Sequence, residues 1–206
     1  MSKKAGKKRV AIFISGRGSN MEKLIRSANE PEYPAIIVGV ISNKTDAKGL
    51  EFAKKQGIAT AIISSKKHGG KVATDEAISK QLESWNADII CLAGYMRLLS
   101  KEFCQKWQGK IINIHPSLLP QFKGLNTHSR AIEAQVTNHG CTVHFVTAQM
   151  DDGPNIGQII VPLQNGDTKE SLEKRVLIAE HNLYPWALAQ VASGEISFAE
   201  ITQASK

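Results

Sequence analysis

A paired amide and imidazole form the most chemically informative pattern in the chain. Residues 111–116 read Ile-Ile-Asn-Ile-His-Pro, so Asn113 and His115 stand two apart in a predicted strand. Alternate residues of a strand face the same side. Both groups can donate hydrogen bonds to a developing oxyanion in a site that holds little water, which is a way to accelerate acyl transfer. A polar pair that only closes a strand end is the alternative interpretation.

A glycine-rich turn offers a place for an anion. Residues 15–20 read Ser-Gly-Arg-Gly-Ser-Asn between a predicted strand and a predicted helix. Backbone N–H groups at such a helix N-terminus bind anions. The third glycine of a dinucleotide fingerprint is replaced by Met21, and no Gly-Lys-Ser/Thr follows. We therefore expect a monophosphate rather than NAD or ATP, unless the glycines serve only the tight turn.

A third segment places carboxylates after another predicted strand. Residues 147–154 read Thr-Ala-Gln-Met-Asp-Asp-Gly-Pro. An acidic pair before Gly-Pro is common in turns without any function. Asp151 gains interest only because the other two polar segments also follow predicted strands.

Short β-branched segments alternate with amphipathic ones, which predicts a doubly wound, mostly parallel α/β sheet flanked by helices, with ligands at the carboxyl ends of its strands. Ser19 or Asn20 is a good N-cap for the first helix. The predicted strands are 9–15, 35–42, 60–63, 87–93, 110–115, 141–147 and 158–161, and the predicted helices are 21–29, 46–56, 71–85, 101–107, 127–135 and 169–191.

Composition places the chain among ordinary globular proteins. It has 206 residues and a formal net charge of +7 with a pI near 9.3. Residues 1–9 hold five of the cations and no acid, so the rest of the chain is nearly neutral. We expect residues 1–8 to form a basic flexible tail and residues 9–206 to form one catalytic domain. No apolar run approaches the length of a membrane span.

The cysteines and histidines argue against a disulfide or a metal centre. Cys91, Cys104 and Cys141 are odd in number and widely spaced, as in reduced proteins of the cytoplasm, where we expect this chain to act. Cys91 and Cys141 lie in apolar runs and are predicted core residues. His139 and His144 are five apart and face opposite sides of a strand, so we expect no structural zinc and a core or supporting role for His144.

Together these segments resemble one family over roughly residues 9–190. The Ser-Gly-x-Gly-Ser-Asn turn, the Asn-Ile-His-Pro-Ser-Leu-Leu-Pro run, Gly-Cys-Thr-Val-His-Phe-Val and the Asp-x-Gly-Pro turn are similar to phosphoribosylglycinamide formyltransferases of purine synthesis. The resemblance implies the formyltransferase fold, a substrate, glycinamide ribonucleotide (GAR), and a co-substrate, 10-formyltetrahydrofolate, without a metal. It also suggests a cis bond before Pro120.

The resemblance also implies roles for individual residues. Asn113 and protonated His115 stabilise the oxyanion, while Asp151 pairs with His115 and accepts the amine's proton. Gly18, Ser19 and Asn20 bind the phosphate of the substrate, and Glu180 contacts the amine end of the substrate. The implied folate contacts are Lys71, Met96, Arg97, Leu98, Leu99, Asn113, Thr147, Ala148, Gln149, Met150 and Asp151.

Three positions depart from the family pattern. Lys71 stands where an Arg is frequent, Leu177 replaces a polar residue, and Asp152 replaces a second glycine. All three bear on ligand affinity rather than on the type of reaction.

Other readings explain less of the sequence. A formyltetrahydrofolate deformylase is the alternative enzyme, but it normally carries an N-terminal regulatory domain, and here the first predicted strand begins at residue 9. A methionyl-tRNA formyltransferase normally carries a C-terminal domain that grips tRNA. A basic nucleic-acid binder would need cations interleaved with aromatic residues across the nearly neutral body. We expect two small-molecule partners, no nucleic acid, no membrane, and a monomer or homodimer.

Overall fold

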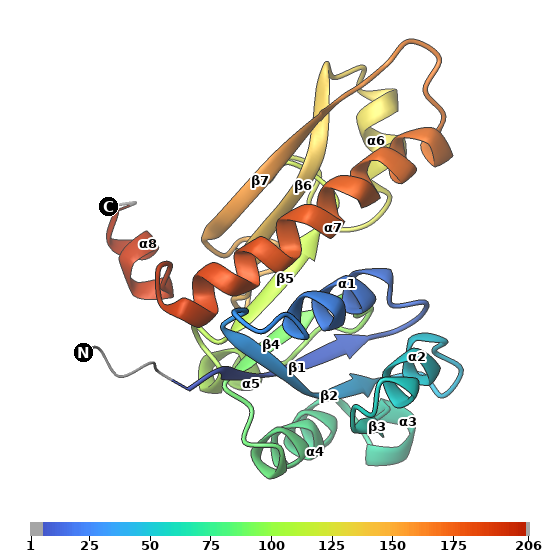
Figure 1. Ribbon diagram of the computed structural model, residues 1–206. Helices are drawn as coiled ribbons and strands as arrows, with labels where there is room; N and C mark the ends of the chain where they lie inside the picture. The colour runs from blue at the N-terminus through green and yellow to red at the C-terminus, as the bar shows by residue number, and fades with distance from the viewer. Residues whose placement is uncertain (1–5, 205–206) are drawn as a thin grey trace, which may run out of the picture.

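A computed structural model describes residues 6–204 and shows one seven-stranded sheet with helices on both faces (Figure 1). The strands are β1 (Lys8–Ile14), β2 (Ala35–Ser42), β3 (Thr60–Ile62), β4 (Ile89–Leu92), β5 (Ile111–His115), β6 (Asn138–Phe145) and β7 (Asn155–Pro162). The helices are α1 (Ser19–Ala28), α2 (Gly49–Lys55), α3 (Ser65–His68), α4 (Lys71–Ser84), α5 (Lys101–Lys106), α6 (Thr127–Glu133), α7 (Lys169–Ser193) and α8 (Phe198–Ala204).

The strand order, β3-β2-β1-β4-β5-β6-β7, is that of a doubly wound sheet with an extended edge. The five strands from β3 to β5 pair in parallel, and β6 pairs antiparallel with both β5 and β7. The chain reverses its winding direction between β1 and β4, which is where such sheets bind ligands. The predicted fold class is confirmed. The polar segments after β1 and β5 follow the carboxyl ends of parallel strands, whereas residues 147–154 follow β6, which runs antiparallel and ends opposite Ile112.

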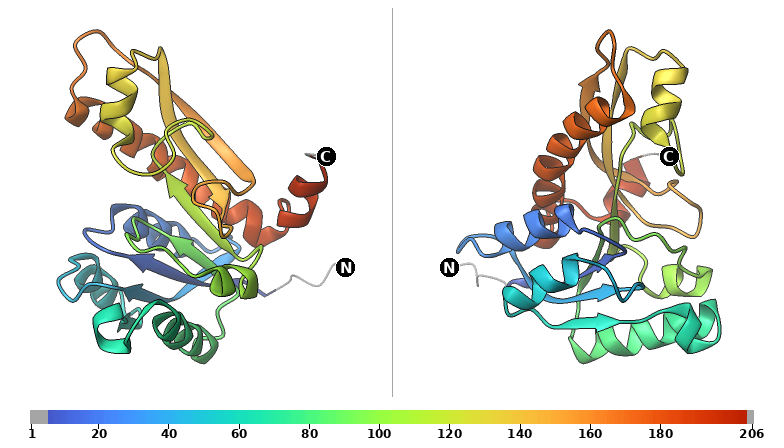
Figure 2. Two further views of the ribbon diagram at one scale, coloured as in Figure 1. Left: turned by 180° about the vertical axis from the view of Figure 1, so that it is seen from behind. Right: turned by 90° about the vertical axis from the view of Figure 1, so that its right-hand side faces the viewer.

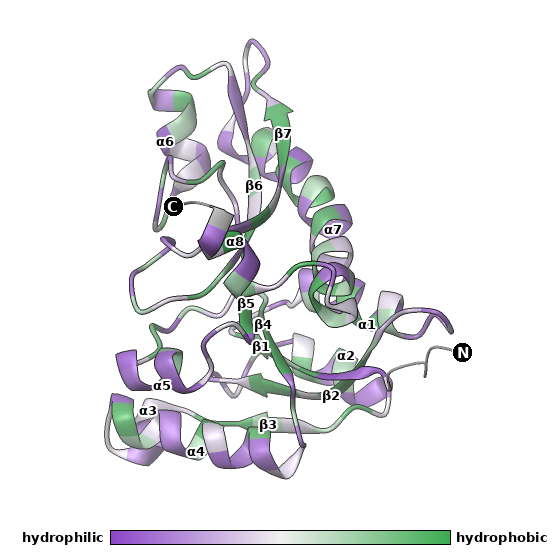
Figure 3. Ribbon diagram, turned by 90° about the vertical axis from the view of Figure 1, so that its left-hand side faces the viewer, coloured by the Kyte–Doolittle hydropathy of each residue, from purple (hydrophilic) through white to green (hydrophobic). Residues whose placement is uncertain are grey.

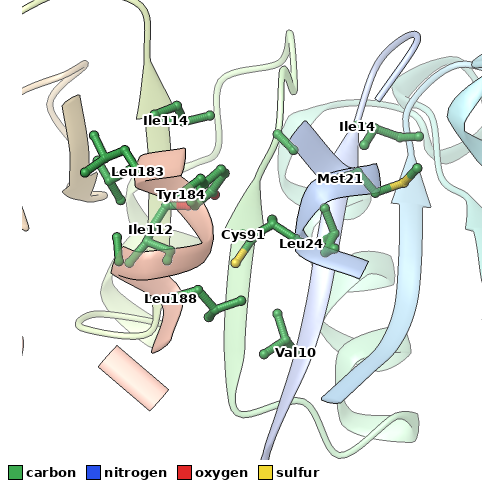
Figure 4. Close-up of a cluster of buried hydrophobic side chains, with 14 of the residues drawn as sticks. Val10, Ile14, Met21, Leu24, Cys91, Ile112, Ile114, Leu183, Tyr184 and Leu188 are labelled. Carbon is green, nitrogen blue, oxygen red and sulfur yellow. The ribbon is translucent and has the colours of Figure 1, made fainter. Parts of the chain in front are cut away.

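Two apolar layers hold the sheet between its helices. On one face, α1, α2 and α7 pack on β1, β4 and β5, and Leu183, Tyr184 and Leu188 of α7 point toward Ile112 and Cys91 (Figure 4). On the other face, α4 and α5 cover side chains of β1 and β4. The strands are apolar and the outward faces of α4 and α5 are polar, as Figure 3 shows. Burial on both faces explains why the parallel strands are continuous apolar runs.

The two antiparallel strands project beyond the parallel part of the sheet, with α7 running along them and α6 near their far end (Figure 2). The Tyr184 hydroxyl of α7 lies 3.0 Å from the Leu92 carbonyl and 3.1 Å from the Ile112 carbonyl. This contact fixes α7 against the ends of β4 and β5. Helix α7 itself begins with a capping box between Thr168 and Ser171.

Several boundaries differ from those predicted. The first strand begins at Lys8, so the last residue assigned to the tail belongs to the sheet, and residues 1–5 lie outside the described part. Strands β6 and β7 each begin three residues earlier than expected, because Asn138 and Asn155 already take part in the antiparallel ladder. Helices α3 and α8 were not predicted. Both are short: α3 has four residues and no apolar side chain, and α8 has seven residues.

The N-cap expected for the first helix was wrong. Helix α1 begins at Ser19 itself, and its N-cap is Gly18, which adopts a left-handed conformation with φ of 77°. Glycine carries no penalty there, since it has no Cβ. The prediction favoured side chains that accept hydrogen bonds, but the tight turn requires a positive φ at residue 18. At the other end of the next helix, Gly57 follows the C-cap Gln56 of α2 with φ of 71°.

All three cysteines are free and buried, and Cys91 and Cys141 lie in the core as predicted. The Leu119-Pro120 bond is cis, in agreement with the resemblance. Within residues 6–204, no group of three or more His, Cys, Asp or Glu side chains is arranged to hold a metal ion. No helix in the described range is long and apolar enough to cross a membrane.

Candidate active site

The amide and imidazole predicted from the strand pattern lie at the carboxyl end of β5. Asn113 is partly buried, and His115 is buried with 5% of its surface exposed. Pro116 follows directly, and His115 keeps its extended conformation as expected for a residue before proline. The antiparallel partner β6 places His144 opposite Asn113 and Thr142 opposite His115. The two side chains therefore share one face of the sheet with His144.

His144 orients the Asn113 amide. Its Nδ1 lies 2.8 Å from the Phe145 carbonyl oxygen and so carries the proton, which leaves Nε2 as the acceptor for the Asn113 Nδ2 at 3.2 Å. Burial lowers the pKa of His144, so the ring stays neutral and keeps this acceptor. One N–H of the Asn113 amide is thereby held, and the other remains for a ligand. The supporting role predicted for His144 agrees with this contact.

Two loops that are distant in sequence contact the His115 ring, one at each nitrogen. Its Nε2 lies 3.0 Å from the Phe122 carbonyl oxygen, to which it donates. Its Nδ1 lies 3.5 Å from Oδ2 of Asp151. An imidazolium satisfies both contacts, since it has an N–H at each nitrogen. Because the Nδ1 contact is longer than a normal hydrogen bond, Nδ1 is the nitrogen that can approach a reacting atom.

Asp151 closes the cluster from the β6–β7 turn. Its side chain is 12% exposed, Oδ2 accepts a hydrogen bond from the Gly124 backbone N–H at 2.8 Å, and Oδ1 lies 3.7 Å from His144 Nε2. The backbone φ of Asp151 is 50°, a conformation that few residues other than glycine adopt. The turn thus directs the carboxylate inward, between the two histidines.

The glycine-rich turn lies across the sheet edge, at the switch point. Its Ser15 hydroxyl donates to Asn43 and accepts from the Met96 backbone N–H at 2.7 Å, so the loops after β1 and β4 are joined. The first N–H groups of α1 have no partners within the helix and face the end of the turn. Gly18, Ser19 and Asn20 occupy the positions that the anion prediction requires.

Two residues predicted to meet the same substrate lie in contact. Asn20 Nδ2 donates to Glu180 Oε2 at 2.6 Å, which joins the start of α1 to α7. Burial is the main cause that raises the pKa of Glu180 to about 7, with the Asn20 hydrogen bond acting in the opposite direction. The side chain of Asn20 is therefore turned toward Glu180. Its backbone N–H is the group that can bind an anion at the start of the helix.

The residues expected to line a folate pocket fall into three environments. Met96, Leu98 and Met150 are apolar and more than half exposed, which suits a surface that covers an aromatic ligand. Arg97 is instead turned inward: its guanidinium pairs with the buried Asp75 at 2.6 Å and also donates to the Lys71 carbonyl. Leu99 and Thr147 are partly buried, and Ala148 and Gln149 are exposed.

Sequence reasoning missed several contacts of the site. It did not foresee Asp75 beneath Arg97, the Phe122 carbonyl on His115, or the Gly124 N–H on Asp151. The last two come from backbone atoms, which carry no side-chain signal. Asp75 had a weak signal, since it is an acid on the inward face of an otherwise amphipathic helix.

Comparison with known proteins assigns this geometry to a family. The sequence profile described as formyl transferase matches residues 8–188. Phosphoribosylglycinamide formyltransferase of Haemophilus influenzae is 42% identical over 92% of this chain and 89% of its own length. The chain belongs to the phosphoribosylglycinamide formyltransferase family. The crystal structure of the family member from Brucella melitensis is 53% identical, covers 92% of this chain and 98% of its own, and superposes with a TM-score of 0.88.

Larger members of the family carry this unit as one part. The trifunctional purine biosynthetic protein adenosine-3 of Bos taurus is 52% identical over 94% of this chain. The chain spans 19% of that relative's length. The similarity therefore concerns the formyltransferase unit of such relatives, and their remaining sequence has no counterpart in these 206 residues.

Proposed function

We propose that the chain transfers the formyl group of 10-formyltetrahydrofolate to the glycyl amine of N1-(5-phospho-D-ribosyl)glycinamide. The products are formyl-GAR and tetrahydrofolate, in de novo purine biosynthesis. One observation carries the proposal: Asn113, His115 and Asp151 converge at the end of β5, in a chain whose match to the Brucella melitensis structure covers 98% of that structure. An amide, an imidazole and a carboxylate are the groups that this acyl transfer needs.

The reaction moves one formyl group and, overall, one proton. The amine of GAR attacks the formyl carbon, and negative charge develops on the formyl oxygen. The free N–H of Asn113 and Nδ1–H of His115 stabilise that charge by hydrogen bonds. Asp151 accepts the proton of the amine, directly or through a water, and N10 of the folate takes up a proton in its place, so that one proton passes from the amine to N10 overall. The C–N bond to the amine forms first, and the C–N bond to N10 breaks as the tetrahedral intermediate collapses.

The phosphate and amine of GAR lie beside the contact between α1 and α7. Backbone N–H groups of Gly18, Ser19 and Asn20 hold the phosphate at the start of α1, where the helix dipole favours an anion. Glu180, buried beside Asn20, meets the cationic or hydrogen-bonding amine end. The distance between these sites and the Asn113 cluster sets the orientation of the substrate.

Folate lies on the other side of the cluster. The exposed apolar side chains of Met96, Leu98 and Met150 cover its ring system, with residues 147–149 as the opposite wall and Leu99 at its base. Lys71 and Arg97 are the cations predicted to contact the folate. Because Asp75 neutralises Arg97, the exposed Lys71 is the stronger candidate to meet the folate's carboxylates.

A spectroscopic assay of formyl-folate consumption, with and without GAR, tests the proposal. We expect consumption only in the presence of GAR, with formyl-GAR formed in equal amount. Consumption in the absence of GAR would instead identify a formyltetrahydrofolate deformylase. No consumption under either condition would contradict both enzymatic readings. The enzyme is proposed to act in the cytoplasm, with residues 9–206 as its catalytic domain. It is proposed to be a monomer or a homodimer, and analytical ultracentrifugation would measure its mass.

A further inference from the structure

An ion pair at the edge of the site joins the two loops that contact His115. Phe122 and Gly124 contact His115 and Asp151 through their backbones, and Lys123 stands between them in sequence. The Lys123 ammonium pairs with the carboxylate of Asp152, the residue directly after Asp151. No step of the proposed reaction uses either charge.

Lys123 lines the same cavity as Asp151. Lys123, Asp151 and Asp152 all line one cavity of about 470 Å³. The Lys123 side chain is 35% exposed and that of Asp152 is 44% exposed, whereas Asp151 is 12% exposed. The Gly124 N–H, one residue from Lys123, is already bonded to Asp151 at 2.8 Å. A modest rotation of the long Lys123 side chain would therefore move its charge from Asp152 toward Asp151.

Such a move would change the chemistry of the cluster. Asp151 has one carboxylate, and an ammonium bound to it competes with the His115 imidazolium for the same oxygens. A second cation beside the ring also disfavours the charged form of histidine. The charge of Lys123 already acts at this cluster, since it is among the causes, after burial, that lower the pKa of His144.

We propose that Asp152 is a positioning residue that binds the Lys123 ammonium and keeps it away from Asp151. Asp151 is thereby left to pair with His115. This inference rests on the proposed function, in which Asp151 and His115 act together. It gives a role to a carboxylate that no step of the proposed reaction uses.

The titratable groups around the cluster of His115, His144 and Asp151 come from four parts of the fold. These are His128 of α6, His139 and His144 of β6, Lys123 of the segment after β5, and Asp151 with Asp152 of the β6–β7 turn. Burial lowers the pKa values of His128, His139 and His144, so these rings are neutral near pH 7. Lys123 is therefore the cation in this set whose position Asp152 can control.

The test compares Asp152→Asn, Lys123→Met and the double variant. If Asp152 only shields Asp151, Asp152→Asn lowers kcat about tenfold, the effect of roughly one pH unit in proton affinity. Lys123→Met lowers kcat less than about threefold, because an exposed pair contributes little. The double variant recovers to the level of Lys123→Met, since no ammonium remains to compete. Asp152→Glu, which can still bind Lys123, keeps most of the activity.

The pH profile separates positioning from a loss of folding. In Asp152→Asn, the dependence of kcat/KM on pH changes, because the displaced ammonium adds a positive charge beside Asp151. Nuclear magnetic resonance spectra of the histidines in the ligand-free protein should show the change without any turnover. Glu83→Gln is the matched control: it breaks the Lys106–Glu83 pair, whose side chains are 52% and 58% exposed, and should leave the profile unchanged.

Two results would overturn the inference. One is an equal loss of kcat in Asp152→Asn and Lys123→Met without recovery in the double variant. That result would mean that the ion pair only connects the two loops. The other is unchanged kcat and pH profile in Asp152→Asn while Asp151→Asn is inactive, which would leave the proposed function standing. Full turnover in Asp151→Asn would contradict the role of Asp151 and this inference with it.

Discussion

A neutral histidine, His144, orients the Asn113 amide, the group that we propose stabilises the oxyanion. His144 accepts from Asn113 at 3.2 Å, and the donor left over is fixed rather than free to rotate. Fixed donors stabilise a developing charge without reorganising during the reaction, which is why such groups contribute strongly to catalysis.

Asn113→Ala should therefore lower kcat by about 10² to 10³. The change removes the donor to the oxyanion and also the partner of His144, so a small loss of stability is expected. Steady-state kinetics with both substrates and a thermal melt would measure the two effects. Near-normal turnover in a folded variant would refute the role of Asn113.

The ionised form of Glu180 lowers the stability of the folded protein. Its pKa is raised to about 7 from an ordinary 4.5, so the folded protein binds this proton more tightly than the unfolded chain does. The free energy of unfolding therefore falls as pH rises from about 4.5 to about 7, and the full penalty is present above that range.

Glu180→Gln should remove this penalty. The amide oxygen of Gln can still accept from Asn20, and no buried charge remains. We expect the variant to be more stable than the parent at pH 8, by up to about 3 kcal/mol, and no more stable at pH 4. Urea unfolding at the two pH values measures the difference, and a higher KM for GAR should accompany it. Equal stability gains at both pH values would count against burial of a charge as the cause.

At the scale of elements, the turn between β6 and β7 is set by a close approach. A Cβ at Gly153 would lie 1.8 Å from the Phe145 carbonyl oxygen, a position occupied by backbone. The Phe145 N–H in turn donates to the Pro154 carbonyl at 2.9 Å. The turn that presents Asp151 is therefore packed directly on the end of β6.

Gly153→Ala should displace this turn and with it Asp151. We expect kcat to fall by at least about tenfold, because small misplacements of a catalytic group are costly. Gly6→Ala is a control for the substitution itself, since nothing lies within 4 Å of the added carbon there. Kinetics and melting temperatures of the two variants would decide. Unchanged kcat in Gly153→Ala would show that the turn can shift without moving its carboxylate.

At the scale of the molecule, the basic charge is mostly terminal. Five of the cations lie in residues 1–9, and the remainder of the chain is close to neutral. What excess remains suits a site for two anionic ligands, a phosphate and a folate carboxylate.

Deleting residues 2–7 should leave catalysis intact. The deletion takes three cations, Lys3, Lys4 and Lys7, from a formal net charge of +7, so the pI falls. The site residues lie elsewhere on the sheet, and we expect kcat and KM within about twofold of the parent, since the deletion removes no contact to a substrate. Isoelectric focusing and the same kinetic assay measure both outcomes. A large loss of activity would assign the segment a role in catalysis.

The sequence by itself determined the local features. Apolar runs of the right period placed the strands, and the two-residue spacing of Asn113 and His115 put them on one face. Those properties depend on nearest neighbours, so a pattern can reveal them. The N-cap at Gly18 was missed for a local reason too, because a left-handed turn competed with a side-chain cap.

Only the tertiary structure decided which distant groups meet. Phe122 and Gly124 act on His115 and Asp151 through backbone atoms, and Asn20 meets Glu180 across 160 residues. Such contacts depend on strand order and on how the loops pack. The sequence of a single segment contains no information about either. Burial is likewise a property of the assembled fold. It makes His144 a neutral acceptor and raises the pKa of Glu180, although both side chains are ordinary in sequence.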